Sequence, residues 1–350
     1  MFRAKNISLK LQSCFLAVVV LLSGCFFIQA ALGQEEITAT LIEGAKKEGK
    51  LLWYTLLATT LAGNFVKKFQ EKYPYIKLEF YRSGDEKLST RIMAEARAKR
   101  NVFDVVVTTG IWAELLKKKG LLAKYLSPHR KFYPEGCKDS EGYWTDIFIN
   151  LNTIGYNTRL VSRPEAPKTW NDLLDPKWKG KLGMDTKAYY WFANMLKMMG
   201  EEKGLEYMKK LSEQDIQFRT GRTLNTQMLV VGEVTIGITL YNAKVEEMKR
   251  KGAPIEWVAI EPVVPEIHPL AISAHAPHPN AAKIFVEFML SKEGQEIMAS
   301  ALKIPSRTDV EAIVPKLKKG IKILPFDFSI ADNYGKYIKL YREILMSKTN

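Results

Sequence analysis

Apolar and polar positions in the first third of the chain follow two periods in turn. Short apolar runs at 51–55 and 103–107 and an alternating stretch at 76–81 predict three strands. Between and after them, apolar side chains recur at helical spacing and predict three helices. These are expected over 60–73, over 85–100 and after Gly110 as far as Lys119, and Gly120 ends the last one. This alternation is typical of an α/β fold with a mostly parallel sheet. Right-handed crossovers then bring the loops that follow the strands to one edge of that sheet.

The middle of the chain repeats the alternation and predicts a second α/β unit. Strands are expected at 143–156, 181–184 and 234–240. Helices are expected at 170–176, 189–199, 202–212 and 224–231. After a strand-like connection at 257–262, a strand at 270–273 and a helix at 280–290 resume the first unit.

A chain that enters the second unit and then returns needs two linkers. The sequence therefore predicts an α/β fold of two lobes, with two crossing strands as the hinge between them. We expect a first lobe made of residues 34–148 and 261–312, and a second lobe made of 149–260. A C-terminal helical segment, 313–350, follows the return.

Residues 1–33 have the pattern of an export signal. Three cations and no acid precede an apolar run at 14–28, and small residues end at Gly33. The run is shorter than the roughly 20 apolar residues that cross a membrane, so we expect a cleaved signal peptide and a periplasmic location. A lipobox-like stretch that ends at Cys25 offers the alternative of a lipid anchor. We favour the soluble product, because three apolar residues follow Cys25 where a lipoprotein tether is normally polar.

Charge and composition narrow the class of protein further. The 350 residues include 52 Lys and Arg against 38 Asp and Glu, and the net charge is +14. The apolar fraction of 47% and the charged fraction of 26% exclude a disordered or fibrous chain. The lysine runs 117–119 and 316–319 suit solvated helix ends, so we expect no nucleic-acid partner. Cys137 is the one cysteine after Gly33, which excludes an internal disulfide and leaves its role open.

Motifs of catalysis and cofactor binding are absent from the sequence. It has no nucleophile elbow, zinc-protease motif, paired-cysteine motif, phosphate loop or dinucleotide fingerprint. His268, His275 and His278 lie among prolines, which prevent the helical spacing of a metal site. We therefore expect no enzyme activity, no cofactor and no metal. The enzymatic alternative is a secreted hydrolase with Ser83 or Thr109 as its nucleophile.

Polar residues at the predicted sheet edge suit a small anion. Two of the loops lead into helices, whose first N–H groups are unpaired and carry a partial positive charge. Ser and Thr also cap helices in general, so capping remains the alternative. In the second unit, guanidinium groups suit a carboxylate or phosphate and tyrosines add hydroxyls, with a solvated loop and core packing as alternatives. The candidate ligand-binding residues are Thr55, Arg82, Ser83, Gly84, Thr108, Thr109, Tyr189, Tyr190, Arg219, Arg222 and Tyr241.

Short motifs from about residue 50 to residue 310 give the chain a family resemblance. They include Leu52–Thr55, Phe69–Pro74, Leu173–Gly180 and, as the strongest, Ala276–Lys283. In order and number they resemble the extracellular solute-binding proteins of ABC importers, and they are similar to the periplasmic iron(III)-binding subfamily. The resemblance implies two lobes with a ligand closed between them, a membrane permease as partner, and no chemistry on the ligand. We expect a monomeric receptor.

The resemblance also implies how iron would be held. Iron-binding members use two adjacent tyrosines at the end of the strand that follows a Gly-Glu motif. That strand here ends in Tyr241 and Asn242, and an amide cannot supply a phenolate. Tyr189 and Tyr190 lie too early in the chain, and the other iron ligands are not recognisable. Asn242 therefore joins the candidate ligand-binding residues, a small anionic solute is favoured, and an iron(III) receptor with Tyr241 as ligand is the alternative.

Overall fold

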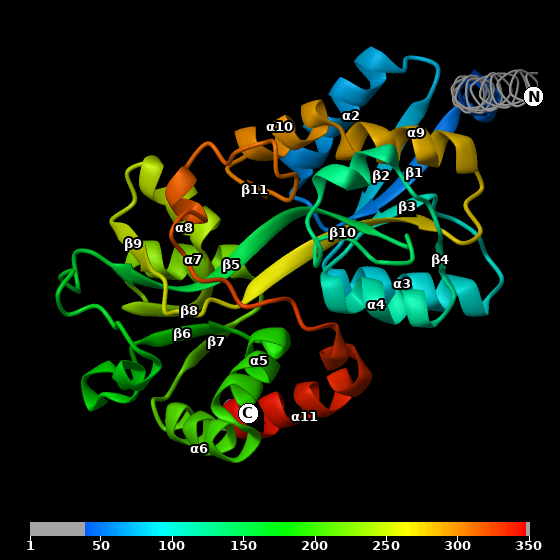
Figure 1. Cartoon of the computed structure of the whole chain (residues 1–350). Helices are drawn as coiled ribbons and strands as arrows, with labels where there is room; N and C mark the ends of the chain where they lie inside the picture. Colours follow the sequence, from blue (N-terminus) through cyan, green and yellow to red (C-terminus); the bar gives the residue numbers. More distant parts are fainter. Residues whose placement is uncertain (1–38, 348–350) are drawn as a thin grey trace, which may run out of the picture.

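The structure of the chain is a computed structural model that describes residues 39–347. The predicted signal peptide and Cys25 lie outside these residues. Within the described part, no helix is both long enough and apolar enough to cross a membrane. Figure 1 shows two lobes that are bridged by the long strands β5 and β10.

The sheet of the first lobe has a parallel centre. β1 (Lys50–Thr55) lies between β2 (Lys77–Arg82) and β3 (Val105–Val107) and is parallel to both. β10 (Pro265–Ser273) continues the sheet, antiparallel to β3. The three valines of β3 and Trp53 of β1 are fully buried, because helices cover the sheet on both faces.

Helices on the two faces of this sheet belong to separate apolar clusters. α2 (Thr59–Lys72), α9 (Pro279–Leu290) and α10 (Lys292–Ser300) pack together on one face. α3 (Asp85–Arg97) and α4 (Gly110–Lys118) contribute to the cluster on the other. The starts of α3 and α4 follow β2 and β3, so both helices begin at the edge of the sheet that the sequence predicts as the ligand side.

The second lobe has a smaller sheet of the same kind. β6 (Leu182–Asp185) lies between β7 (Gln217–Arg219) and β8 (Ile236–Tyr241) and is parallel to both. Its helices are α5 (Tyr189–Met199), α6 (Glu201–Ser212), α7 (Arg222–Val231) and α8 (Asn242–Arg250).

One strand belongs to both lobes. β5 (Thr145–Asn157) is buried at every residue. Its first half pairs with β10 and β11 (Ile304–Pro305), and its second half pairs with β8 and β9 (Ile255–Val258). The chain returns from β9 to β10 through residues 259–264. Two connections therefore cross between the lobes, and the predicted two-lobe α/β fold is confirmed.

A few elements differ from the sequence-based prediction. β10 begins at Pro265 rather than at residue 270, because prolines at 265 and 269 weaken a strand pattern that is present nonetheless. β7, α8 and α10 are not predicted at all. β7 has only 3 residues, and α8 and α10 are short helices with few apolar positions, so neither period is visible in the sequence.

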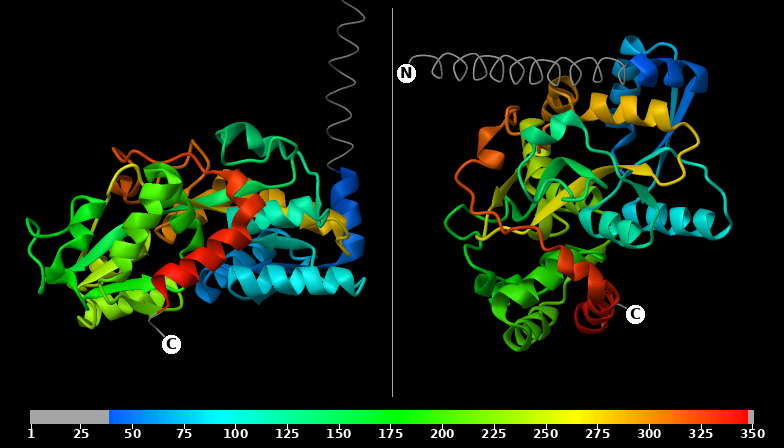
Figure 2. Two further views of the ribbon diagram at one scale, coloured as in Figure 1. Left: turned by 90° about the horizontal axis from the view of Figure 1, so that it is seen from below. Right: turned by 45° about the vertical axis from the view of Figure 1, so that its right-hand side comes forward.

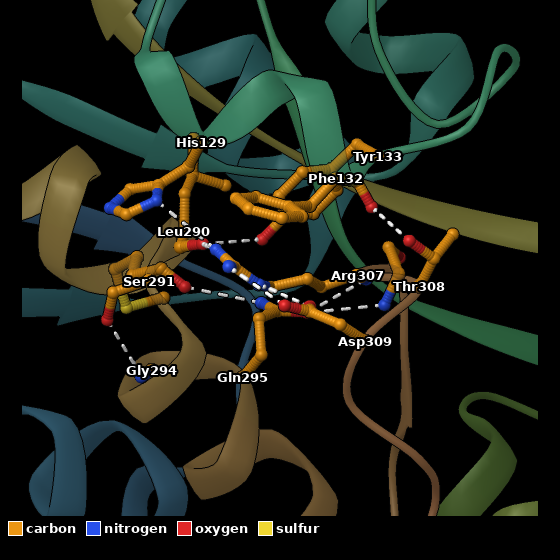
Figure 3. A network of polar contacts seen from close by, with 12 residues as sticks. His129, Phe132, Tyr133, Leu290, Ser291, Gly294, Gln295, Arg307, Thr308 and Asp309 are labelled. Carbon is orange, nitrogen blue, oxygen red and sulfur yellow. Dashed lines mark hydrogen bonds and ion pairs between the residues drawn. The ribbon is translucent and has the colours of Figure 1, made fainter.

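A buried arginine fastens the returning chain to the first lobe, as Figure 3 shows. Arg307 is 5% exposed, and its Nε lies 2.6 Å from Oδ1 of Asp309. The same guanidinium donates to the Leu290 carbonyl at 3.0 Å and lies 4.0 Å from the ring centroid of Phe132. Tyr133 donates to that carbonyl as well, at 3.0 Å. These contacts fix the segment after β11 and the loop before β5 to the end of α9.

The C-terminal segment contacts both lobes. Its α-helix, α11 (Tyr334–Leu345), packs on α5 and α6 of the second lobe. Just before it, Asp332 pairs with Lys118 of α4 in the first lobe, and Asp327 pairs with Lys197 of α5 at 2.5 Å. Figure 2 shows α11, in red, beside the green helices of the second lobe and close to the cyan helices of the first. The segment thus lies across the junction of the lobes.

Candidate functional site

Helices from both lobes begin where the lobes meet. Lys187, which precedes α5, forms an ion pair of 2.5 Å with Glu86 in the first turn of α3. The two residues lie 101 positions apart and belong to different lobes. Helix starts leave N–H groups unpaired and carry partial positive charge. The junction therefore combines helix N-termini with charged side chains, and the lobes are in contact there.

Asp85 is the first residue of α3 and faces this junction. Its Oδ1 accepts a hydrogen bond from the Glu86 N–H at 2.8 Å, and its Oδ2 accepts one from the Thr109 hydroxyl at 3.1 Å. Burial raises the pKa of the Asp85 carboxyl, against the opposing effects of these hydrogen bonds and of the charges of Lys187 and Arg222. The residue thus lies within electrostatic reach of cations on the second lobe.

Arg222 begins α7 and points at the same junction. Its side chain is 12% exposed and forms an ion pair with Asp185 at the end of β6. The guanidinium also lies 5.3 Å from the ring centroid of Tyr241. The Nε atom of Arg222 is buried and has no hydrogen-bond partner within residues 39–347. One donor of this arginine is therefore available to a bound molecule.

Tyr241, the last residue of β8, donates its hydroxyl hydrogen to Oε2 of Glu266 on β10. The contact joins a strand of the second lobe to a crossing strand. Burial raises the pKa of Glu266, and the nearby Asp85 and Asp185 carboxylates add to this while Arg222 opposes it. Burial and the charge of Glu266 likewise raise the pKa of Tyr241 well above its ordinary value.

The C-terminal segment supplies a further tyrosine. Tyr334 lies between Trp112 of the first lobe and Tyr189 of the second, with ring centroids 6.0 and 6.2 Å away. Burial raises its pKa well above the ordinary value, and the charges of Asp85 and Glu266 add to the shift. We call the residues gathered here the inter-lobe cluster: Asp85, Glu86, Asp185, Lys187, Arg222, Tyr241, Glu266 and Tyr334.

Several residues that the sequence predicts for the site lie in or next to this cluster. Arg222 and Tyr241 belong to it, and Thr109 binds Asp85 directly. Ser83 and Gly84 immediately precede Asp85 and are partly or fully exposed. Three other predicted residues lie where strands of the first lobe end: Thr55 is buried and accepts from the Leu57 N–H, Thr108 is buried beside Ser89, and Arg82 is exposed. Tyr189 packs against Tyr334.

Three predicted residues have their side chains engaged elsewhere. Arg219 donates to its neighbour's carbonyl and lies 3.4 Å from Glu233 at the surface. The Tyr190 hydroxyl accepts from the Asp327 N–H at 3.0 Å, and its ring stacks on Phe326. The Asn242 amide is fully buried and donates to the carbonyl of Leu317 at 2.8 Å. In these three cases the neighbours in the fold, which the sequence does not reveal, take up the polar groups.

Other members of the cluster are missed by sequence reasoning. Asp85 directly follows the predicted binding residues Ser83 and Gly84, and Asp185 directly follows the strand expected at 181–184, so their positions carried a signal. Glu266 is an acid in an apolar stretch, and this is a weaker signal of a functional residue. Tyr334 has no signal in the sequence, because only the packing of α11 brings it to the junction.

The cluster is suited to holding a small polar molecule. It offers a free guanidinium donor, an ammonium group, tyrosine rings and hydroxyls, and carboxylates. Within residues 39–347, no group of three or more His, Cys, Asp and Glu side chains is arranged to hold a metal ion. Non-covalent capture of an ionic solute is the chemistry that these groups support.

Comparison with known proteins agrees with the fold. A family model of bacterial extracellular solute-binding proteins matches residues 100–333. An uncharacterized protein of Haemophilus influenzae is 28% identical over 314 residues, which cover 83% of this chain and 87% of that protein. A periplasmic protein of Salmonella typhimurium, whose name proposes 2-aminoethylphosphonate as its ligand, is 25% identical over 221 residues, or 59% of this chain and 63% of that protein.

Solved structures share the two-lobe architecture over nearly their whole length. AfuA from Actinobacillus pleuropneumoniae, with fructose-6-phosphate bound, is 27% identical with a TM-score of 0.76, and the match covers 85% of this chain and 99% of AfuA. Iron-bound HitA from Pseudomonas aeruginosa also has a TM-score of 0.76, at 22% identity, over 84% of this chain and 99% of HitA. The likeness to HitA shows the fold alone.

Proposed function

Because the chain belongs to the bacterial extracellular solute-binding proteins, we propose that it captures a small anionic solute between its lobes and delivers it to the membrane permease of an ABC importer. The chain is the solute-binding component of an ABC transporter. Proteins of this family bind their ligand without catalysing a reaction, so the hydrolase alternative is discarded.

The observation that carries the proposal is the free donor of Arg222. Its buried Nε has no partner within the described residues, and it lies at the start of α7, where the helix N-terminus adds partial positive charge. Lys187 provides a second cation from the same lobe. A planar guanidinium with a free edge favours phosphate, phosphonate or carboxylate groups. The names of the AfuA structure and of the Salmonella protein, which specify a sugar phosphate and a phosphonate, agree with an anionic ligand.

The remaining parts of the proposal concern where and how the protein acts. We propose export by residues 1–33, a periplasmic location and a monomeric state, with lipidation at Cys25 as the alternative. Mass spectrometry of the protein purified from its host distinguishes the two: cleavage after Gly33 gives an unmodified chain, and lipoprotein processing gives an acylated Cys25. Light scattering of the mature protein should give the mass of one chain.

Iron(III) is the second candidate ligand, because several relatives are named for it. Tyr241 would be a ligand, but the next residue, Asn242, has its amide bound to the Leu317 carbonyl. The protein should therefore lack the visible charge-transfer band of iron bound to phenolate. A coloured preparation whose band disappears in Tyr241→Phe would establish the iron receptor instead.

A thermal-shift screen tests the anionic ligand. A ligand at a hundredfold excess over its dissociation constant adds about 2.7 kcal/mol of stability. For a chain of this size that corresponds to a rise of roughly 5 °C in melting temperature. Phosphates, phosphonates and carboxylates should produce such a shift, whereas neutral sugars and polyamines should not.

A matched pair of variants locates the site. Arg222→Lys keeps a cation beside Asp185 but removes Nε and the planar donor edge, so the shift should fall by about half for a tenfold loss of affinity. Arg219→Lys makes the same chemical change at an arginine that is engaged by Glu233 outside the cluster, and should leave the shift intact. Equal effects of the two variants would contradict the proposed site.

A further inference from the structure

The two cations of the inter-lobe cluster already have carboxylate partners. Arg222 pairs with Asp185 inside the second lobe, and Lys187 pairs with Glu86 across the junction. The first pair is buried, with side chains 12% and 6% exposed. The second is about one-third exposed on each side, so water screens it and an arriving anion can replace Glu86 at little cost.

Two more carboxylates in the cluster have no cation of their own. Asp85 accepts from the Thr109 hydroxyl and from a backbone N–H, and Glu266 accepts from the Tyr241 hydroxyl. Among residues 39–347, neither carboxylate has a cation within ion-pair distance. The cluster therefore contains four carboxylates and two cations, with the excess located at Asp85 and Glu266.

Such an excess is costly in the closed protein. A carboxylate that leaves water without a counter-charge loses its hydration, and a hydroxyl partner offsets only part of that loss. The two unpaired groups come from different elements, the start of α3 and the strand β10, and the charge of Asp85 adds to the raised pKa of Glu266. Both lie where charged groups of the two lobes meet.

We propose that the captured solute is a zwitterion, with an ammonium group in addition to its anionic group. Asp85 and Glu266 receive the ammonium group, and the free Nε of Arg222 together with Lys187 receives the anionic group. The solute thus supplies the missing positive charge to the two carboxylates. This inference rests on the proposed function and specifies the substrate class of the same site.

If Asp85 and Glu266 were protonated when the ligand binds, the site would prefer a different ligand. Burial raises the pKa of both Asp85 and Glu266 in the empty protein. If they stayed protonated on binding, they would donate hydrogen bonds to a plain anion, and an ammonium group on the ligand would be unfavourable. Ligand pairs that differ only in the ammonium group therefore separate the two arrangements.

Isothermal titration of the mature protein at neutral pH with such pairs is the first test. The probes are 2-aminoethylphosphonate with ethylphosphonate, 3-aminopropylphosphonate with propylphosphonate, glucosamine 6-phosphate with glucose 6-phosphate, and β-alanine with propionate. In the pair of correct length, the amine should bind at least about tenfold more tightly, as expected for a hydrogen bond between charged groups. A best ligand without an amine would overturn the inference and leave the proposed function standing. No binding in any pair would overturn both.

The second test determines whether Asp85 and Glu266 bind the ammonium group of the ligand. Asp85→Asn and Glu266→Gln should each weaken binding of the amine about tenfold or more. The same variants should strengthen binding of the matched plain anion, because they remove a repelling charge. Glu233→Gln removes a surface carboxylate that pairs with Arg219, and should change neither. A parallel loss of both ligands in the two site variants would show a structural role for these carboxylates and overturn the inference.

Discussion

Glu266→Gln should stabilise the ligand-free protein at neutral pH while it impairs binding. Glu266 is partly buried, has no cation within ion-pair distance in the described chain, and accepts a hydrogen bond from Tyr241. Glutamine keeps an oxygen for that hydroxyl and removes the charge. A fully buried unpaired charge costs several kcal/mol, so for this partly buried group we expect a gain of about 1–2 kcal/mol. In melting temperature this is a rise of roughly 2–4 °C.

The gain should depend on pH with a definite sign. Because the folded protein raises the pKa of Glu266 above its ordinary value of 4.5, the folded state binds the proton more tightly than the unfolded state. The wild type therefore loses stability as the pH rises from the ordinary pKa through the raised one. Below the ordinary pKa the carboxyl is neutral in both states and the cost disappears. Asp85, Asp185, Arg222 and Tyr241 also face this carboxyl, and they remain unchanged in the variant.

Urea denaturation of wild type and Glu266→Gln between pH 4 and pH 8 measures this difference. The two proteins should have similar stability at pH 4, and the variant should become the more stable one as the pH rises. Glu233→Gln serves as the control, because that carboxylate is at the surface beside Arg219 and should show no such trend. A destabilised variant at pH 7, or a difference that does not change with pH, would refute the reasoning.

Three further predictions follow from contacts at and near the junction. Lys187→Met should lower the free energy of unfolding by less than about 1 kcal/mol, since its pair with Glu86 is partly exposed, but should weaken anion binding about tenfold by titration calorimetry. Tyr334→Phe should raise the dissociation constant about threefold to tenfold through its lost hydroxyl, and the melting temperature should stay nearly constant because the ring still packs on Trp112. Cys137 should resist iodoacetamide at pH 8 until the protein is unfolded, because burial raises the pKa of its thiol to about 12; rapid labelling of the native protein would contradict this.

The fold could be predicted where the local pattern is strong. The run at 51–55 and the helix at 189–199 appear in the structure with nearly the expected bounds, because each carries a clear apolar period. α8 and α10 could not, since their stability depends on packing against neighbours rather than on a visible period. The two-lobe organisation was accessible because both crossing connections have strand-like composition.

The candidate site was accessible only in part, for a different reason. Thr109 follows from the rule that loops after parallel strands meet at one sheet edge, and Arg222 follows from its place just ahead of a predicted helix. Glu266 and Tyr334 come from a crossing strand and from the C-terminal segment, whose places at the junction depend on contacts between distant parts of the chain. Asn242 is the opposite case, because a sequence position next to a cluster residue does not determine where the side chain points, and its amide binds the Leu317 carbonyl.

The backbone of β8 explains how adjacent residues acquire such different roles. β5 pairs Thr153 with Leu240 but Gly155 with Gly237, so one residue of β5 faces two of β8, and the register shifts there. Thr239, inside this bulge, is buried and has a φ of 60°, which is strained for a β-branched residue. Such strain persists where the surrounding structure enforces it, often at functional sites. Beyond the bulge, Tyr241 reaches Glu266 while the next side chain turns to Leu317, so replacing that neighbour with tyrosine would not by itself place two phenolates together.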